Sequence, residues 1–317
     1  MRNRILTSLL AVACLAGTGL SAARPQQAPA ISLPGYPTVG SPPTVTLVAA
    51  GAEPRTRLRY KPAASSKEVM TMSMTMGLSM VMEGMSMPAM DMPVMKMTAD
   101  LGVTSVAPNG DVTYEVAFTG MTMEALPGMD PTLAAMAQGT ADSIKALKGS
   151  VTMTDRGINK SSTMNVDQIA DPMLKQMLSS MSSSLESMSM PFPDEAIGVG
   201  GKWEVRQAIK NAGAQMFQRI QCEVVSVDAQ GVTIKANLEQ TIPQQSITNP
   251  ALPGATMNVE KGGGMSAGTS TMRFTGIVPT SEVSGSTAMA MAVEMGGQTQ
   301  RMSIETKLKV SIAPKKN

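Results

Sequence analysis

Val69–Met97 has the sequence VMTMSMTMGLSMVMEGMSMPAMDMPVMKM, and twelve of its last 28 residues are methionine. From Met70 to Met76, and again at Met80 and Met82, methionine occupies every second position. Alternate side chains of a β-strand lie on opposite faces, so a strand here would carry all of these methionines on one face. We therefore expect a strand whose methionine side packs in the core, in the place that branched and aromatic residues usually take.

The spacing of the methionines changes at Met82, where steps of two residues give way to alternating steps of three and two. Parity switches at each three-residue step, so no single face of a regular strand would hold this second series. Gly84, Pro88 and Pro93 also oppose regular strand pairing. We expect a loop or the end of a long hairpin here.

Core packing explains methionines in such a loop less well than methionines in a strand. Three explanations remain open: packing or low-complexity drift, an apolar contact surface, and a site for a soft cation such as Cu(I) or Ag(I). Thioether sulfur is a preferred ligand of these soft cations, and the absence of histidine disfavours Cu(II) and Zn(II). The candidate metal ligands are Met82, Met85, Met87, Met90, Met92 and Met95.

The composition argues against catalysis and against nucleic-acid binding. The chain has no histidine, so it can form neither a Ser-His nor a Cys-His relay. A net charge of +2 and 3% aromatic residues give no basis for a nucleic-acid partner. The adjacent carboxylates Asp194 and Glu195 are typical of an exposed turn, and the glycines at 262–264 are typical of a hairpin loop rather than a phosphate loop. We expect no enzyme, and no cofactor unless Cu(I) is bound.

The first 23 residues have the features of an export signal. Arg2 and Arg4 precede an apolar stretch, Ile5–Leu20, and small residues suited to cleavage follow it. Cys14 offers an alternative, because Ala11–Cys14 resembles a lipoprotein box in which that cysteine becomes the lipidated first residue. Both alternatives predict export to the periplasm or beyond, with membrane association only if Cys14 is lipidated.

The cysteine content predicts a fold that depends on its core. Cys14 and Cys222 are the two cysteines, so no internal disulfide is expected once the signal is removed. Cys222 lies in an alternating apolar stretch and is expected to be a buried, inert thiol. Residues 24–54 are rich in proline, alanine and glycine and are predicted to be a disordered linker, with the ordered part starting near Arg55.

After that linker, a period of two residues dominates the apolar pattern. It is clear over Met95–Val103, Val112–Phe118 and Met302–Ile312, each with polar residues at the alternate positions. This pattern is typical of half-buried antiparallel strands. Two stretches, 131–148 and 171–188, instead have helical spacing and begin with Asp130-Pro131 and Asp171-Pro172.

The order of motifs suggests an internal repeat in the chain. The stretch 101–116 can be aligned with 222–236 as strand, glycine-containing turn and strand, and 149–158 resembles 268–277. We predict a mainly β fold with one or two helices (α+β), a large curved antiparallel sheet or open barrel made of two related β-meander halves. The predicted organisation is a signal peptide at 1–23, a linker at 24–54, a first half at 55–166, a linking helix and turn at 167–197, and a second half at 198–313.

One group of motifs resembles a known kind of protein. The Leu58-Arg59-Tyr60-Lys61 opening, the methionine-rich strand pair, the glycine-turn hairpin, a helix, and FPDEAIGVGGKW at Phe192–Trp203 follow one another in this order. Together they resemble a family of functionally uncharacterised exported bacterial proteins, with "FP…VGxxW" as the most recognisable element. The resemblance covers most of 55–312 and implies a β-rich periplasmic or surface-attached protein without known activity.

Two hypotheses of different class follow from the sequence. In the first, this is an exported non-catalytic β-rich protein that holds an apolar ligand such as a lipid, or acts as a structural or interaction protein of the cell envelope. In the second, it is a periplasmic soft-metal binder that uses the loop 82–95. An open apolar surface would favour the first, and clustered sulfurs facing solvent would favour the second.

Overall fold

The computed structural model describes residues 31–124, 147–165, 190–211, 213–248, 256–295 and 298–315, which are mainly β. The strands are β1 (Thr44–Ala49), β2 (Lys67–Met82), β3 (Met85–Ser86), β4 (Met90–Asp91), β5 (Val94–Val106), β6 (Val112–Glu124), β7 (Lys148–Met153), β8 (Asn159–Met164), β9 (Lys202–Asn211), β10 (Ala214–Val227), β11 (Gly231–Ile242), β12 (Gln245–Thr248), β13 (Thr256–Arg273), β14 (Thr280–Met295) and β15 (Gln298–Pro314).

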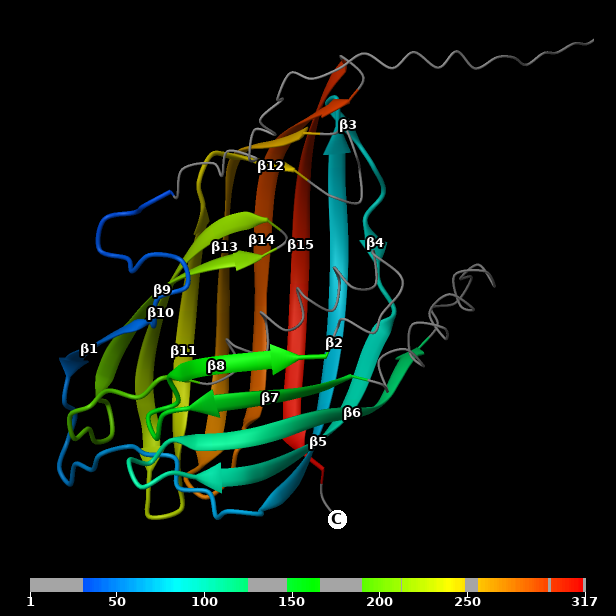
Figure 1. Ribbon diagram of the computed structural model, residues 1–317. Helices are drawn as coiled ribbons and strands as arrows, with labels where there is room; N and C mark the ends of the chain where they lie inside the picture. The colour runs from blue at the N-terminus through cyan, green and yellow to red at the C-terminus, as the bar shows by residue number, and fades with distance from the viewer. Residues whose placement is uncertain are drawn as a thin grey trace, which may run out of the picture. The chain divides into compact units, whose positions relative to one another are not determined.

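All of these strands belong to one antiparallel sheet with the order β1-β9-β10-β11-β13-β14-β15-β2-β5-β6-β7-β8 (Figure 1). β12 pairs with β13, and the short β3 and β4 pair with β2. The path ends at β1 and β8, which do not pair with each other in the described part of the chain, so the sheet is not closed. The predicted large antiparallel sheet is confirmed.

The middle of the sheet joins sequence segments that lie far apart in the chain. β2 pairs with β15 in one unbroken register, from Met82 opposite Met302 to Met70 opposite Pro314. Both strands were predicted from their alternating patterns, and residues directly opposite each other in an antiparallel pair point to the same face. The methionine side of β2 and the apolar side of β15 therefore form one surface.

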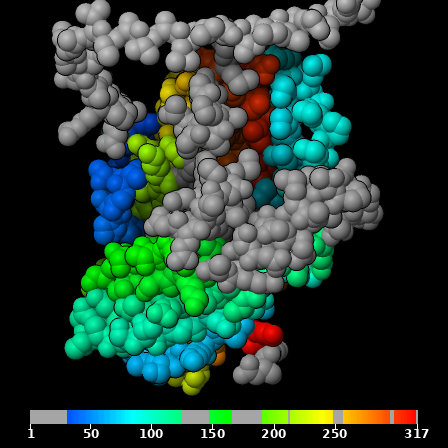
Figure 2. Space-filling view, turned by 45° about the vertical axis from the view of Figure 1, so that its right-hand side comes forward, coloured from blue at the N-terminus to red at the C-terminus, as the bar shows by residue number. Residues whose placement is uncertain are grey.

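At one end, the sheet folds over and packs against itself. Figure 1 shows β5 to β8 crossing in front of β11, β13, β14 and β15, and Figure 2 shows these four strands as a layer at the lower end of the view. Val103, Val112 and Met153 of this layer share one buried core with Trp203 and Ile234. A second buried cluster, which includes Met70, Met97 and Phe118, continues this core toward β2.

The expected helices at 131–148 and 171–188 are not borne out, because the described residues contain no helix. Nearly all of both segments lies outside the described ranges. The prediction is wrong at Lys148, which begins β7 rather than ending a helix. There Val151 and Met153 alternate with polar residues and pair with β6, so strand pairing determines the structure. Within the described ranges, then, nothing helical is long and apolar enough to cross a membrane.

Two stretches that were predicted to be irregular are strands. Thr44–Ala49, inside the predicted linker, forms β1, because Val45 and Leu47 alternate with polar residues and pack on the core beside β9. The glycines at 262–264 lie within β13, not in a loop. A Cβ at Gly264 would lie 2.6 Å from Ser286 O and from Thr287 Oγ1, so the close neighbouring strand requires glycine here.

The two matched hairpins are both present. Residues 101–116 form the end of β5, a turn with Gly110 at φ +88°, and the start of β6. Residues 222–236 form the corresponding end of β10, a turn and the start of β11. The duplication of whole halves that this match suggests stays a prediction.

Candidate functional site

The candidate site is built on the methionine face, which we define as the side of the sheet that carries Met70, Met72, Met74, Met76, Met80 and Met82 of β2. On β15 this face carries Met302, Ile304 and Leu308, which lie directly opposite Met82, Met80 and Met76. Leu308 is 36% exposed, so part of this apolar face reaches solvent.

The second methionine series forms the strand that returns along the free edge of β2. Glu83 and Gly84, both at positive φ, make a two-residue turn that places Met85 opposite Met82. The N–H of Met87 then donates to the carbonyl of Met80 at 2.8 Å. The chain therefore continues the hairpin of β2 instead of leaving it as an open loop.

Two β-bulges in the return strand keep its methionines on the same face as the methionines of β2. After Met87, the return strand uses three residues for two on β2, so that Met90 lies opposite Leu78. The same excess follows Met92, whose N–H donates to Met76 O at 2.8 Å, and Met95 lies opposite Met74. Each bulge contains a proline, and an extra residue in one strand shifts its alternation by one position.

The expectation that no single face holds the series is therefore wrong. All twelve methionines from Met70 to Met97 lie on the methionine face, because each three-residue step coincides with the turn or a bulge. Sequence alternation alone could not show this, although a proline in each of the two later three-residue steps was a usable signal.

Burial of these methionines changes along the strand pair. Met70 and Met97 are 2% and 4% exposed and belong to the core. The four methionines of the return strand that lie farthest from this core are largely exposed, at 73% for Met85, 46% for Met87, 48% for Met90 and 45% for Met92. Of the candidate metal ligands, Met82 and Met85 are directly opposite each other, while Met95 pairs with Met74 near the core.

The methionine face continues across the sheet into the buried core. From Met74, the residues opposite one another are Val310, Val283, Gly268, Ala236, Cys222 and Trp203. Cys222 is 2% exposed, and burial raises the pKa of its thiol to about 12. A thiol that stays protonated is a poor nucleophile, and the expected burial of this cysteine is confirmed.

Several residues that carry the family resemblance gather in the core. Tyr60 stacks on Phe192 with ring centroids 4.9 Å apart, and the indole N–H of Trp203 donates to Pro191 O at 2.9 Å. Burial raises the pKa of Tyr60 well above its ordinary value. Ile197 is fully buried beside them. The Phe192–Trp203 element therefore holds the fold together where the chain crosses the end of the sheet.

A polar row, which the sequence analysis missed, crosses the methionine face. Gln207 Nε2 donates to Gln218 Oε1 at 2.6 Å, and Gln218 Nε2 donates to Gln240 Oε1 at 2.9 Å. Gln218 is only 9% exposed. The row continues through Gly264 on β13 to Thr287 and Thr306 on β14 and β15. The available signal was glutamine at positions where the alternation calls for an apolar residue.

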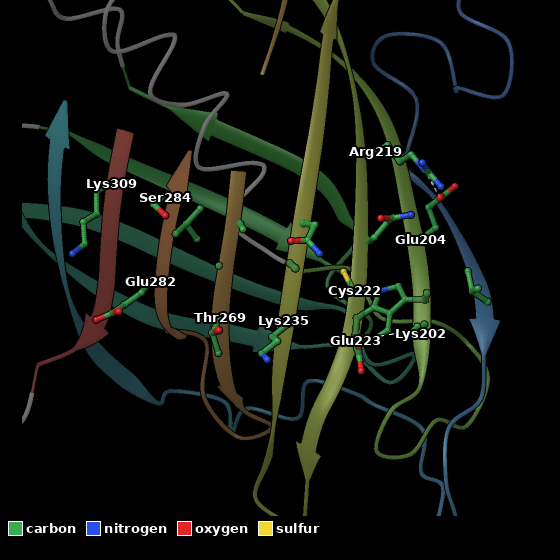
Figure 3. Close-up of a pocket in the computed structure, with 18 residues that line it drawn as sticks. Lys202, Glu204, Arg219, Cys222, Glu223, Lys235, Thr269, Glu282, Ser284 and Lys309 are labelled. Atoms are coloured by element: carbon green, nitrogen blue, oxygen red, sulfur yellow. Dashed lines mark hydrogen bonds and ion pairs between the residues drawn. The ribbon is translucent and has the colours of Figure 1, made fainter. Parts of the chain in front are cut away.

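The opposite face of the sheet, which we call the charged face, carries an open groove of about 780 Å³ (Figure 3). Its lining residues come from β1, β9, β10, β11, β13, β14 and β15. Those labelled in Figure 3 are Cys222, whose side chain lies on the methionine face, and the charged-face residues Lys202, Glu204, Arg219, Glu223, Lys235, Thr269, Glu282, Ser284 and Lys309.

Ion pairs occupy one end of this groove. Burial would raise the pKa of Glu204, but hydrogen bonds from Arg219 and Arg206 outweigh it and hold that pKa below its usual value. At the other end, Lys235 and Lys309 have no ion-pair partner among the described residues. The groove is thus a solvated, mixed-charge surface.

The described ranges contain no cluster of three or more cysteine, aspartate or glutamate residues arranged to hold a metal ion. The chain matches no protein-family model, and it has no significant match among curated proteins. The methionine face and its polar row are therefore the features from which a function has to be argued.

Proposed function

We propose that this chain is an exported, non-catalytic β-rich protein that holds an apolar ligand, such as a lipid, against its methionine face. The observation that carries the proposal is the placement of all twelve methionines of Met70–Met97 on one face, next to Met302, Ile304 and Leu308. An exposed, continuous apolar surface is typical of ligand or partner binding in soluble proteins.

The choice of methionine supports a ligand of variable shape. Its side chain is unbranched and flexible and carries a polarisable sulfur, so a methionine surface can adapt to different apolar partners. The exposed fraction rises from 2% at Met70 to 73% at Met85, so the same surface is core at one end and accessible at the other. A ligand bound along β2 would extend the core without a change in backbone structure.

The test is binding of an uncharged apolar fluorophore, N-phenyl-1-naphthylamine, to the mature protein. We expect its fluorescence to rise on binding, and native mass spectrometry of protein from its own host to show a bound lipid that organic extraction removes. Replacing Leu308 and Met76 by serine should weaken fluorophore binding, while serine at the charged-face residue Met265 should not. No fluorescence change and no co-purifying lipid would contradict the proposal.

A second candidate function is supported by the exposure of four methionines. Met85, Met87, Met90 and Met92 lie on one face with 45% to 73% exposure, next to the methionines of β2. Directly opposite residues in such a pair have Cβ atoms about 5 Å apart, within reach of flexible thioethers that share one ion. This arrangement favours Cu(I) or Ag(I) binding by the predicted ligands Met82 to Met95.

The metal hypothesis is tested by a competition titration with a Cu(I) chelator of moderate affinity. If the site exists, the mature protein withdraws Cu(I), and leucine at Met85, Met87, Met90 and Met92 abolishes the withdrawal. Leucine keeps the apolar volume, so these variants should still bind the fluorophore. Equal withdrawal by the variant and the original protein would exclude these residues as the ligands.

A further inference from the structure

The polar row on the methionine face is built as a directed chain of donors. Gln207 donates to Gln218 and Gln218 donates to Gln240, so each step uses one amide N–H₂ and one amide oxygen. The chain ends at Gln240 Nε2, which has no acceptor among the described residues. An amide group with its acceptor used and its donor free can bind a ligand oxygen.

One hydroxyl group lies across a glycine from this donor, and a second lies on the next strand. Gly264 lies opposite Gln240 on one side and opposite Thr287 on the other. Thr287 Oγ1 lies 2.6 Å from the place that a Cβ at Gly264 would take, so the hydroxyl lies over the glycine. Thr306 is directly opposite Thr287. Neither threonine hydroxyl has a hydrogen-bond partner among the described residues.

Apolar rows flank these polar groups on both sides. Toward the open end of the sheet, the next row contains Ile242, Met289, Ile304 and Met80. Toward the core, the next row is apolar on β11, β15 and β2, with Leu238, Leu308 and Met76, and carries Ser266 and Gly285 on β13 and β14 between them. On β11 and β15 the polar row is therefore one residue wide, and a ligand that lies along these strands would cross it once.

We propose that the ligand is an amphiphile whose ester or amide carbonyl joins two apolar segments, with that carbonyl bound between Gln240, Thr287 and Thr306. The proposal rests on the proposed function, because it assigns the ligand class of the methionine face. A carbonyl oxygen accepts two hydrogen bonds, and the missing side chain at Gly264 lets the Thr287 hydroxyl lie over β13, on the side of Gln240. The apolar segments lie on the two flanking rows.

Selectivity follows from the cost of unpaired polar groups. A pure hydrocarbon would cover the amide and both hydroxyls without bonding to them, whereas a carbonyl at this position accepts hydrogen bonds from two of these three groups. A site that hydrogen-bonds its ligand rejects the analogue that lacks the bonding group more strongly than an apolar site rejects an altered chain. The polar row thus selects ligands by the position of the carbonyl along the ligand's own chain.

The test compares two probes of equal length for displacement of bound N-phenyl-1-naphthylamine. One is a wax ester with its ester group in the middle of the chain, and the other is a straight alkane. We expect the ester to displace the fluorophore at a concentration on the order of tenfold lower than the alkane. Moving the ester group to one end of the chain should remove this advantage.

The variant Thr287→Val with Thr306→Val removes both hydroxyls with little change in shape. It should bind the ester about tenfold more weakly and the alkane no more weakly. Thr269→Val on the charged face of β13 is the matched control and should change neither. Equal displacement by ester and alkane, or an unchanged preference in the double variant, overturns the inference while the proposed function holds. Failure of the fluorophore to bind overturns both.

Discussion

Single methionines of this chain differ in exposure although they share one face and one strand pair. Met70 is 2% exposed and packs with Phe118 and Val116, whereas Met85 is 73% exposed at the hairpin end. The difference comes from what lies over each side chain, since strand alternation places them alike. Burial, rather than residue type, decides what each methionine contributes to stability.

A comparison of two substitutions tests this distinction. Met70→Ala should lower the free energy of unfolding by roughly 2 to 5 kcal/mol, because it leaves a cavity in the core. Met85→Ala should change it by less than about 0.5 kcal/mol, because this side chain is largely solvated. Urea unfolding of both variants gives the measurement, and equal losses of stability would show that Met85 is buried.

The buried thiol and phenols predict a loss of stability at high pH. Burial raises the pKa of Cys222 from 9.0 to about 12, and that of Tyr114 from 10.0 to about 12. Above about pH 9 the unfolded chain releases protons that the folded chain retains, so the free energy of unfolding falls as the pH rises toward 12. Well below pH 9 these groups are protonated in both the folded and the unfolded chain, so they add no pH dependence to the free energy of unfolding.

Urea midpoints measured across this alkaline range provide the check. Cys222→Ala should show a smaller decline than the original protein between pH 9 and 12, because one of the titrating groups is gone. A decline of the same size in both proteins would mean that the thiol is not buried in the folded state.

At the scale of elements, the return strand β3–β5 shows where sequence reasoning succeeds and where it ends. The alternation in β2, β5, β6 and β15 predicted each strand, because one buried face leaves a period of two in the sequence. The prolines at 88 and 93 suggested an interruption of pairing, yet the strands absorb them as bulges, each of which shifts the register by one residue and keeps the methionines on one face. A bulge depends on the partner strand, which lies outside any local window.

Cysteine pairs in a Cys222→Ala background test the bulge near Pro88. Gly77 lies opposite Asp91 in the bulged register, whereas a strand without the extra residue would bring Met90 to that place. Gly77→Cys with Asp91→Cys should form a disulfide under mild oxidation, since directly opposite residues meet its distance requirement. Gly77→Cys with Met90→Cys is the control and should stay reduced. A disulfide in the Gly77–Met90 pair and none in the Gly77–Asp91 pair would show that the strand has no bulge near Pro88.

The candidate site was only partly predictable from sequence. Alternation identified the methionine side of β2, but the polar row required the pairing of β9, β10 and β11, which brings Gln207, Gln218 and Gln240 together from separate strands. β1 was missed because its proline-rich surroundings concealed a short alternating stretch, Val45 and Leu47. Both features depend on contacts between distant segments.

For the whole molecule, the fold of the sheet onto itself predicts cooperative unfolding. Val103 and Val112 of the crossing layer share a core with Trp203 and Val224 on the opposite side. Trp203→Ala should lower the free energy of unfolding by about 3 to 5 kcal/mol, and it should do so for both layers at once. Hydrogen exchange followed by mass spectrometry would show equal loss of protection in β6 and β10. Loss confined to β9 and β10 would show that the layers unfold separately.

The pairing of β2 with β15 also sets an order of events during synthesis. Met82 lies opposite Met302, so the first long strand to leave the ribosome must wait for almost the last one. A waiting strand rich in valine and isoleucine would be prone to join other chains. β2 instead alternates flexible methionine with serine and threonine, and its partner carries Lys307 and Lys309 on the other face. The residues that make this surface adaptable in the finished protein also suit a strand whose one edge stays unpaired until β15 has been made.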